Sequence, residues 1–179
     1  YSHIAIGSAY LMGIRFPENF NFPYHAKSPK DFWRRWHISL SSWIRDYLYF
    51  PLMGLKGGNT STLGIGQQVQ ISSLRAVFAL FATWAIMGLW HGAAWTFVFW
   101  GLWHASIIFT HRIIIRTMNV DALPRAVIWG ASVLSIYLIM LGWIPFRAES
   151  VSETIAMLKA FVDPSRWLFI GLRENTYLI

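Results

Sequence analysis

The chain has 179 residues, of which 55% are hydrophobic and 13% are charged, with a mean hydropathy of +0.42. This composition is too apolar for an ordinary soluble domain, and the eleven Trp, seven Tyr and thirteen Phe are typical of the aromatic belts of membrane proteins. The net charge of +7 comes from bases between apolar segments, which favours a membrane protein and no nucleic-acid partner. Cysteine is absent, which excludes disulfides and thiolate metal ligands.

The N-terminal part of the sequence predicts a short apolar segment followed by a loop. Residues 4–14 are apolar but too short to cross a bilayer, so we expect the end of a helix that begins upstream. Residues 15–24 contain two prolines and two asparagines, which favour a loop. Because the chain begins without Met and ends in an apolar phrase, we interpret residues 1–179 as one partial domain of a longer polytopic protein.

A long amphipathic helix is predicted next, over residues 28–49. Ser28 is a typical N-cap, with proline at the first helical position and an acid at the third. At 100° per residue, Arg34 and Arg45 lie on one side, with His37 on the border of the apolar face. A helix of this kind lies at the membrane interface or lines a polar cavity. The apolar face is formed by Trp33, Trp36, Leu40, Trp43, Ile44 and Tyr47.

The stretch 76–109 contains no Asp, Glu, Lys or Arg, and it follows a Gly-, Ser- and Thr-rich segment, residues 53–70, that predicts a loop. As one helix the stretch would be about 50 Å long, against about 30 Å for the hydrocarbon core. We therefore expect two membrane segments broken near Gly88 and Gly92, or a re-entrant segment. Such a break places His91 inside the membrane, where titratable side chains are usually functional.

Residues 126–144 predict a third span that Pro145 closes, and residues 152–162 predict a short amphipathic helix. If the uncharged stretch crosses twice, the basic residues up to Arg75 and those of 112–125 lie on one side, which the positive-inside rule places in the cytoplasm. The sequence thus predicts an all-α integral membrane protein with about three transmembrane segments and a long interfacial helix.

Two histidines carry the candidate chemistry, because no Gly-rich phosphate loop, carboxylate pair or His-x-x-x-His motif is present to indicate nucleotide hydrolysis, glycosidase activity or a metal. His37 follows Trp36, and His91 follows Trp90. A neutral imidazole accepts a proton near neutral pH and so can activate a hydroxyl for attack on an acyl carbonyl. The residues alone leave open whether His91 is a base or a core histidine, and they favour a structural role for His37.

Several motifs, in order along the chain, resemble those of the membrane-bound O-acyltransferase family. Residues 32–41 (FWRRWHISLS) and 43–49 (WIRDYLY) resemble its signature block. Residues 15–21 (RFPENFN), 88–92 (GLWHG) and 142–148 (GWIPFRA) are similar to further motifs of the bacterial alginate O-acetyltransferase branch. The D-alanyl transfer protein of teichoic acid modification is a more distant resemblance.

This resemblance implies an O-acyltransferase of the bacterial inner membrane, embedded in the lipid bilayer by several spans. It would transfer an acetyl group from a thioester donor, acetyl-CoA or an acyl carrier, to a hydroxyl of a cell-surface polysaccharide. The acceptor can also be a periplasmic or membrane partner in the polysaccharide export pathway. The resemblance makes His91 the general base and His37 the histidine that positions or polarises a reactant. Further substrate-binding candidates are Arg34, Arg45, Trp36 and Trp90, the two arginines for an anionic donor.

Two other classes of function remain open at the level of sequence. A transporter or channel-like subunit would use His91 in a proton or substrate path, although such proteins favour inverted repeats and we find no internal repeat. A catalytically silent scaffold would make His37 and His91 replaceable. Headgroup contacts or helix salt bridges explain the two arginines equally well. The roles of His3 and His104 are not assigned.

Overall fold

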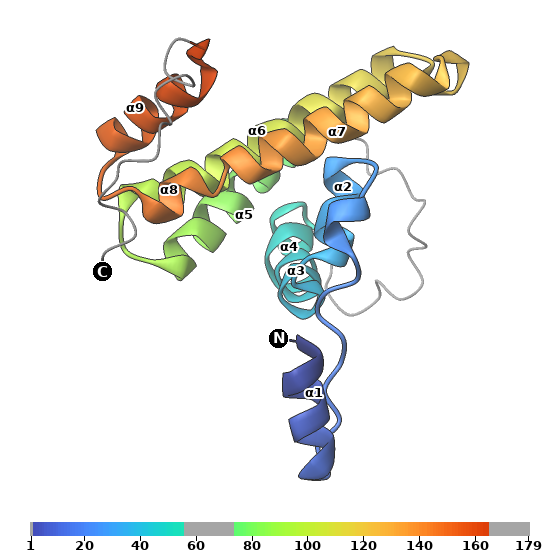
Figure 1. Cartoon of the computed structure of the whole chain (residues 1–179), viewed down its shortest axis with the longest axis vertical. Helices are drawn as coiled ribbons and strands as arrows, with labels where there is room; N and C mark the ends of the chain where they lie inside the picture. Colours follow the sequence, from blue (N-terminus) through green and yellow to red (C-terminus); the bar gives the residue numbers. More distant parts are fainter. Residues whose placement is uncertain (1, 56–73, 165–179) are drawn as a thin grey trace.

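The computed structural model of the chain describes residues 2–55 and 74–164. Within these ranges every regular element is helical, and the all-α fold class is confirmed (Figure 1). The loop predicted for residues 53–70 lies outside the described residues from position 56 onward. Three stretches are long and apolar enough to cross a membrane: α5 (Leu74–His91), α6 (Trp95–Thr117) and the segment Arg125–Arg147, which begins with α7 (Arg125–Leu141).

The N-terminal helix α1 (Ser2–Leu11) lies apart from the other helices at one end of the molecule (Figure 1). Its apolar side chains, such as Leu11 at 92% exposure, have little protein around them. The following segment is irregular as expected, apart from a 3-10 turn at Pro23–His25. This segment leads from α1 to the layer formed by the longer helices.

The continuous helix predicted for residues 28–49 is wrong, because the chain kinks after its second turn. The predicted start is confirmed: α2 (Pro29–Arg35) has Ser28 as its N-cap, and Ser28 Oγ accepts a hydrogen bond from Asp31 N at 3.1 Å. The helix then ends, and α3 (Ile38–Ile44) begins in a new direction. The kink is held by hydrogen bonds from a distant loop, described below, which local spacing does not reveal.

The kink also changes which side chains of the predicted apolar face are buried. After α3, a π-helical turn (Arg45–Tyr49) leads into α4 (Phe50–Leu52), which continues beyond the predicted end of the helix. Trp43 and Tyr47 are 58% and 69% exposed and stack on each other with ring centroids 5.4 Å apart. Ile44 is instead buried in the core. The single apolar face is therefore divided, since residues after the kink no longer share the rotation of those before it.

The uncharged stretch forms two antiparallel helices, α5 and α6, joined by a short turn after His91. Two glycines allow the backbones to approach closely. A methyl group at Gly88 would overlap the Phe97 carbonyl, and one at Gly101 would overlap the Trp84 carbonyl. This reciprocal contact is typical of small residues between membrane helices. His91 is the last residue of α5, so it lies at the turn between the two helices and not in the middle of a span.

The span predicted for residues 126–144 is divided by a turn near its end. α7 ends at Leu141, and a separate short helix α8 (Ile144–Arg147) follows. The sequence predicts that Pro145 ends the span. In the structure Pro145 lies in the first turn of α8, a position where proline is favoured, so it begins a new helix. α8 packs on α6, and its Phe146 ring meets the ring of His91 at the end of α5, with centroids 5.4 Å apart.

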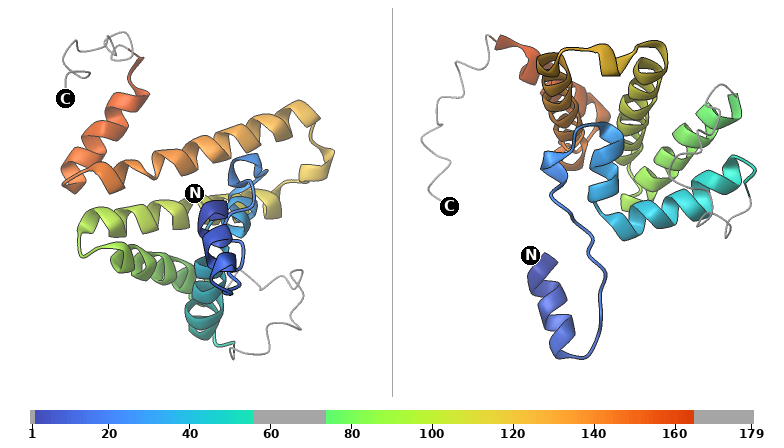
Figure 2. Two further views of the ribbon diagram at one scale, coloured as in Figure 1. Left: turned by 60° about the horizontal axis from the view of Figure 1, so that its bottom comes forward. Right: turned by 90° about the vertical axis from the view of Figure 1, so that its right-hand side faces the viewer.

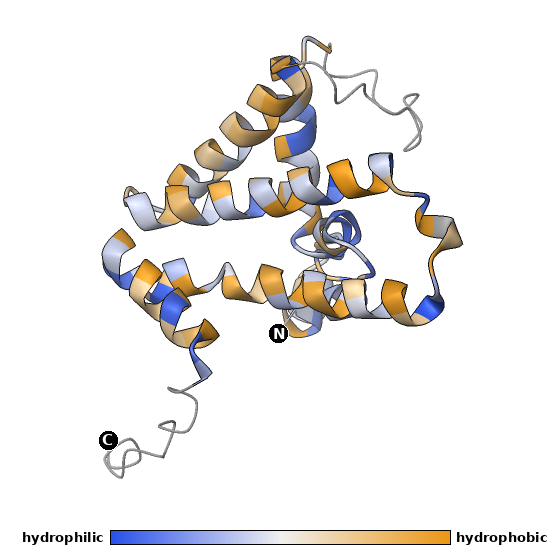
Figure 3. Ribbon diagram, turned by 90° about the horizontal axis from the view of Figure 1, so that it is seen from above, coloured by the Kyte–Doolittle hydropathy of each residue, from blue (hydrophilic) through white to orange (hydrophobic). Residues whose placement is uncertain are grey.

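α7 and the last described helix, α9 (Val151–Val162), both pack on α6. α7 runs back along α6, and Trp103 Nε1 of α6 donates a hydrogen bond to Leu138 O of α7 at 2.9 Å. α2 lies beside both of these long helices (Figure 2). Mostly apolar residues follow the lengths of the long helices (Figure 3), in keeping with a membrane environment.

Candidate functional site

His37 lies at the kink between α2 and α3 in the left-handed backbone region, with φ +45° and ψ 56°. This conformation costs a non-glycine residue about 1–2 kcal/mol. Asn19, in the loop after α1, offsets the cost by taking the place of a local helix cap. Its carbonyl oxygen accepts from Ile38 N at 2.9 Å, and its Oδ1 accepts from Ser39 N at 3.0 Å and from Ser39 Oγ at 2.6 Å. The loop thus fixes the position from which His37 projects.

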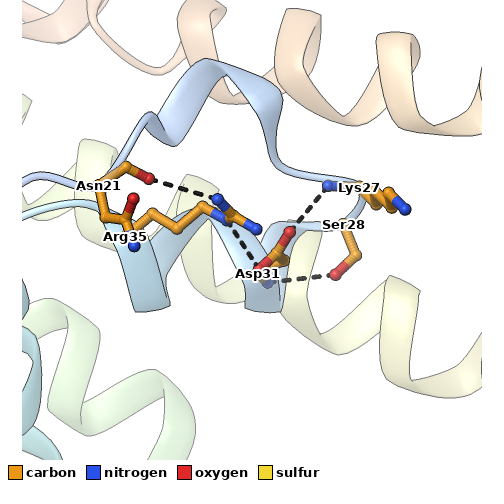
Figure 4. Close-up of polar contacts among 5 residues, drawn as sticks. All are labelled: Asn21, Lys27, Ser28, Asp31 and Arg35. Atoms are coloured by element: carbon orange, nitrogen blue, oxygen red, sulfur yellow. Dashed lines mark hydrogen bonds and ion pairs between the residues drawn. The ribbon is translucent and has the colours of Figure 1, made fainter.

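The helix before the kink is fixed by a second network (Figure 4). Asp31 accepts hydrogen bonds from Arg35 Nε at 3.0 Å and from Lys27 N at 3.1 Å. Burial raises the pKa of Asp31, but the hydrogen bonds from Arg35 and Lys27 outweigh it and hold that pKa below its ordinary value. Asn21 N donates to Arg35 O at 2.9 Å, so the same loop also closes the C-terminal end of α2. Both sides of the kink are therefore tied to one segment.

A cavity of about 350 Å³ opens between the kink and the turns that follow α5 and α7. His37 and His91 both line it, although they come from helices far apart in the sequence. The Nδ1 of His37 is buried without a hydrogen-bond partner among the described residues, as are the Nε1 atoms of Trp33 and Trp100 in the same lining. The other lining residues are Trp33, Trp36, Leu40, Ser41, Met87, Trp100, Trp143 and Phe146.

His91 is half-buried and surrounded by aromatic rings. Its ring centroid lies 4.9 Å from that of Trp90, 5.1 Å from Trp100 and 5.4 Å from Phe146, all in edge-to-face arrangements. Trp100 and Phe146 are also in mutual contact at 5.3 Å. These rings fix the orientation of the imidazole, and no described residue forms a hydrogen bond with its nitrogens, so within the described structure they are available for a reactant.

His104 occupies a closed space behind the cavity wall. Its side chain is completely buried, and its ring contacts Trp33 at 5.1 Å, Trp84 at 5.6 Å and Trp100 at 5.0 Å. A methyl group at Gly142 would lie 2.5 Å from its Nε2, so α7 can approach only because this position is glycine. His104 therefore supports two of the cavity's tryptophans and does not itself line the cavity.

The structure brings together some of the predicted site residues and leaves others outside. Trp36 lines the cavity with the two histidines, whereas Trp90 is 64% exposed and reaches the site only through its contact with His91. Arg34 is exposed, and Arg45 forms an ion pair with the neighbouring Asp46 at 2.7 Å. Neither arginine lines the cavity.

Sequence reasoning gave no role to three aromatic residues of the cavity: Trp100, Trp143 and Phe146. Trp143 and Phe146 fall in the GWIPFRA motif, and Trp100 comes directly before residues 101–104, which repeat the Gly-Leu-Trp-His of residues 88–91. These motifs were the sequence signal that could have identified the three aromatic residues, but a motif does not show that separate segments line one cavity. Among the described residues, no three His, Cys, Asp or Glu side chains gather as metal ligands would.

Similarity to known proteins covers most of the chain. A family model for membrane-bound O-acyltransferases matches residues 1–152. The chain is 40% identical to a probable alginate O-acetylase of Azotobacter vinelandii, over 97% of the chain and 31% of that protein. It is 35% identical to a peptidoglycan O-acetyltransferase of Helicobacter pylori, over 90% of the chain and 28% of that protein. A teichoic acid D-alanyltransferase of Bacillus subtilis is 41% identical over 60% of the chain and 26% of its own length. The chain spans less than a third of these relatives, and it belongs to the membrane-bound O-acyltransferase family.

Proposed function

We propose that the full-length protein is a membrane O-acyltransferase that moves an acetyl group from a thioester donor to a hydroxyl of a cell-surface polysaccharide, or of a partner in its export. The observation that carries this proposal is the meeting of His37 and His91 in one aromatic cavity. The names of the relatives, an alginate O-acetylase and a peptidoglycan O-acetyltransferase, support the acetyl group and the polysaccharide. Their bacterial origin supports an inner-membrane location.

In the proposed reaction, His91 accepts the proton of the acceptor hydroxyl while the hydroxyl oxygen attacks the acyl carbonyl carbon. The carbon–sulfur bond then breaks, and the departing sulfur takes the proton from His91, so that an ester and a free thiol form. His37 donates a hydrogen bond to the carbonyl oxygen as negative charge develops on it. The tryptophans around the cavity exclude water, which would otherwise hydrolyse the donor.

The chemistry of the cavity lining fits neutral reacting groups. Apart from the two histidines, its described lining contains no acidic or basic side chain. A thioester and a sugar hydroxyl are both uncharged and can enter such a site without the cost of burying an unpaired charge. An anionic part of the donor would have to lie outside the cavity, and any role of Arg34 or Arg45 in holding it belongs there.

The test is acetyl transfer by the purified full-length protein in detergent, with labelled acetyl-CoA as donor and polysaccharide as acceptor. Detergent removes any sealed compartment, so activity under these conditions cannot be transport. A positioned general base contributes about 10²–10⁴-fold, so His91→Ala should lose at least about two decades of rate. His111→Ala is the matched control, because His111 lies in α6 and does not line the cavity.

Two results would contradict the proposal. Near-wild-type transfer by a well-folded His91→Ala protein would remove His91 from the role of base. No transfer to glycan or protein acceptors, together with gradient-dependent uptake in vesicles, would favour the transporter hypothesis.

A further inference from the structure

A second cavity, of about 550 Å³, lies between the loop before α2 and one face of α7, and it shares no lining residue with the cavity of the two histidines. On the loop side it is lined by residues 24–27. The α7 residues recur every three or four positions, as one face of a helix does. They are Arg125, Ile128, Trp129, Ser132, Val133 and Ile136.

The loop wall of this groove is held firmly against α7. The Ser132 hydroxyl lies 3.0 Å from Lys27 O and 2.9 Å from Ile128 O of its own helix, and its one proton is shared between these two carbonyl oxygens. One residue earlier, Ala26 is buried in a cluster with Phe32 of α2 and Ile139 of α7. The groove is therefore part of the packed structure and is not a chance gap between two independent surfaces.

Two cations line the groove, and neither has an acidic partner among the side chains that the structure describes. Lys27 and Arg125 are both exposed. Asp31 lies near Lys27 but accepts from its backbone amide and from Arg35, and the Lys27 side chain points away from it (Figure 4). Because Lys27 lies opposite Ser132, about 10 Å along α7 from Arg125, an anionic group lying between the two residues would have one cation on each side.

The rest of the groove is apolar and runs along a helix that is suited to a membrane. From Arg125 to Ile136 the face extends about 16 Å, with isoleucine and valine side chains beyond the cation. Only 17% of this candidate span is buried among the residues that the structure describes. Arg125 at one end of this face and the apolar channel beyond it match an amphiphile with an anionic head group. The basic ends of membrane spans attract lipids of this kind.

We propose that this groove binds an anionic phospholipid, with its phosphate between Lys27 and Arg125 and one acyl chain along Ile128, Val133 and Ile136. A soluble phosphate compound would use the two cations but leave the apolar part unfilled. An apolar segment of the same protein would fill the channel but leave both charges without a partner. The lipid satisfies both parts of the groove.

The test uses the full-length protein in detergent and native mass spectrometry to count bound phosphatidylglycerol, with phosphatidylcholine of the same acyl chains for comparison. The groove variant is Lys27→Gln with Arg125→Gln. Its matched control is Lys30→Gln with Arg116→Gln, which removes the same charge from exposed positions outside the groove. Loss of two cations should weaken phosphatidylglycerol binding at least about tenfold in the groove variant and less than about twofold in the control.

A second variant, Val133→Trp, narrows the apolar channel without changing any charge and should also reduce phosphatidylglycerol binding. Glycerol phosphate, which has the head but no acyl chains, should not displace the lipid. Equal binding by the groove variant and its control, or no preference over phosphatidylcholine, would overturn the proposal. Displacement by glycerol phosphate or coenzyme A would overturn it in favour of a soluble phosphate ligand.

Discussion

Replacing Asn19 with alanine should reduce acyl transfer although Asn19 lines neither of the two cavities described above. Its side-chain oxygen accepts two hydrogen bonds from Ser39, at 3.0 Å from the backbone nitrogen and at 2.6 Å from the hydroxyl. Both bonds hold the start of α3, directly after His37. Alanine keeps the backbone carbonyl that accepts from Ile38 N and removes only these two side-chain bonds. The change therefore acts on the kink and leaves both histidines in place.

The expected size follows from the energies of helix capping. Loss of a side-chain cap costs about 0.5–2 kcal/mol. The left-handed conformation of His37 itself costs about 1–2 kcal/mol, so losing the cap removes a comparable part of what holds the kink. If the loss appears fully as a shift away from the kinked form, the competent population falls about two- to thirtyfold.

The assay is initial acetyl-transfer rate per amount of monodisperse full-length protein in detergent. Asn19→Asp should restore most of the rate because it keeps an acceptor oxygen at the same place. Asn21→Ala is the matched control, since Asn21 bonds Arg35 through its backbone in the described structure. Equal rates for Asn19→Ala and Asn21→Ala would refute the reasoning that the loop positions His37.

Two further predictions concern stability, measured as melting temperature of the full-length protein. Gly101→Ala should lower the melting temperature, because the added methyl overlaps the Trp84 carbonyl and overpacking costs about 1–3 kcal/mol. The control is Gly130→Ala, in open space on α7, which should leave the melting temperature equal or higher. Equal losses for both variants would contradict the close α5–α6 contact. Asp31→Asn should destabilise near neutral pH, because the folded-state pKa of Asp31 lies below its unfolded value and the stabilisation is complete above that unfolded value. The difference in melting temperature between Asp31→Asn and the wild type should shrink as the pH falls below about 3.8 and through the folded-state pKa of Asp31. A difference in melting temperature that does not depend on pH would show that the Arg35 ion pair is not its source.

The sequence by itself determined the features that depend on local composition and spacing. The lack of charge in residues 76–109 set the membrane class and required two helices, because hydrophobic length is a local property. Ser28 and the residues after it set the start of α2, since a cap acts on its own first turn. The motifs around His37 and His91 marked both histidines as candidates, although the sequence does not show that they line one cavity.

Only the tertiary structure decided the kink and the cavity. The hydrogen bonds that hold His37 come from Asn19, in a separate segment, so helical periodicity predicts a straight helix where the protein has a bend. The closeness of α5 and α6 depends on Gly88 meeting Phe97 across the turn, which a list of residues does not show. The pairing of His37 with His91 in one space follows from both, because it requires a bent first segment packed on a tightly closed pair of helices. Contacts between distant segments depend on the whole fold, whereas the sequence pattern reports only what neighbours along one helix share.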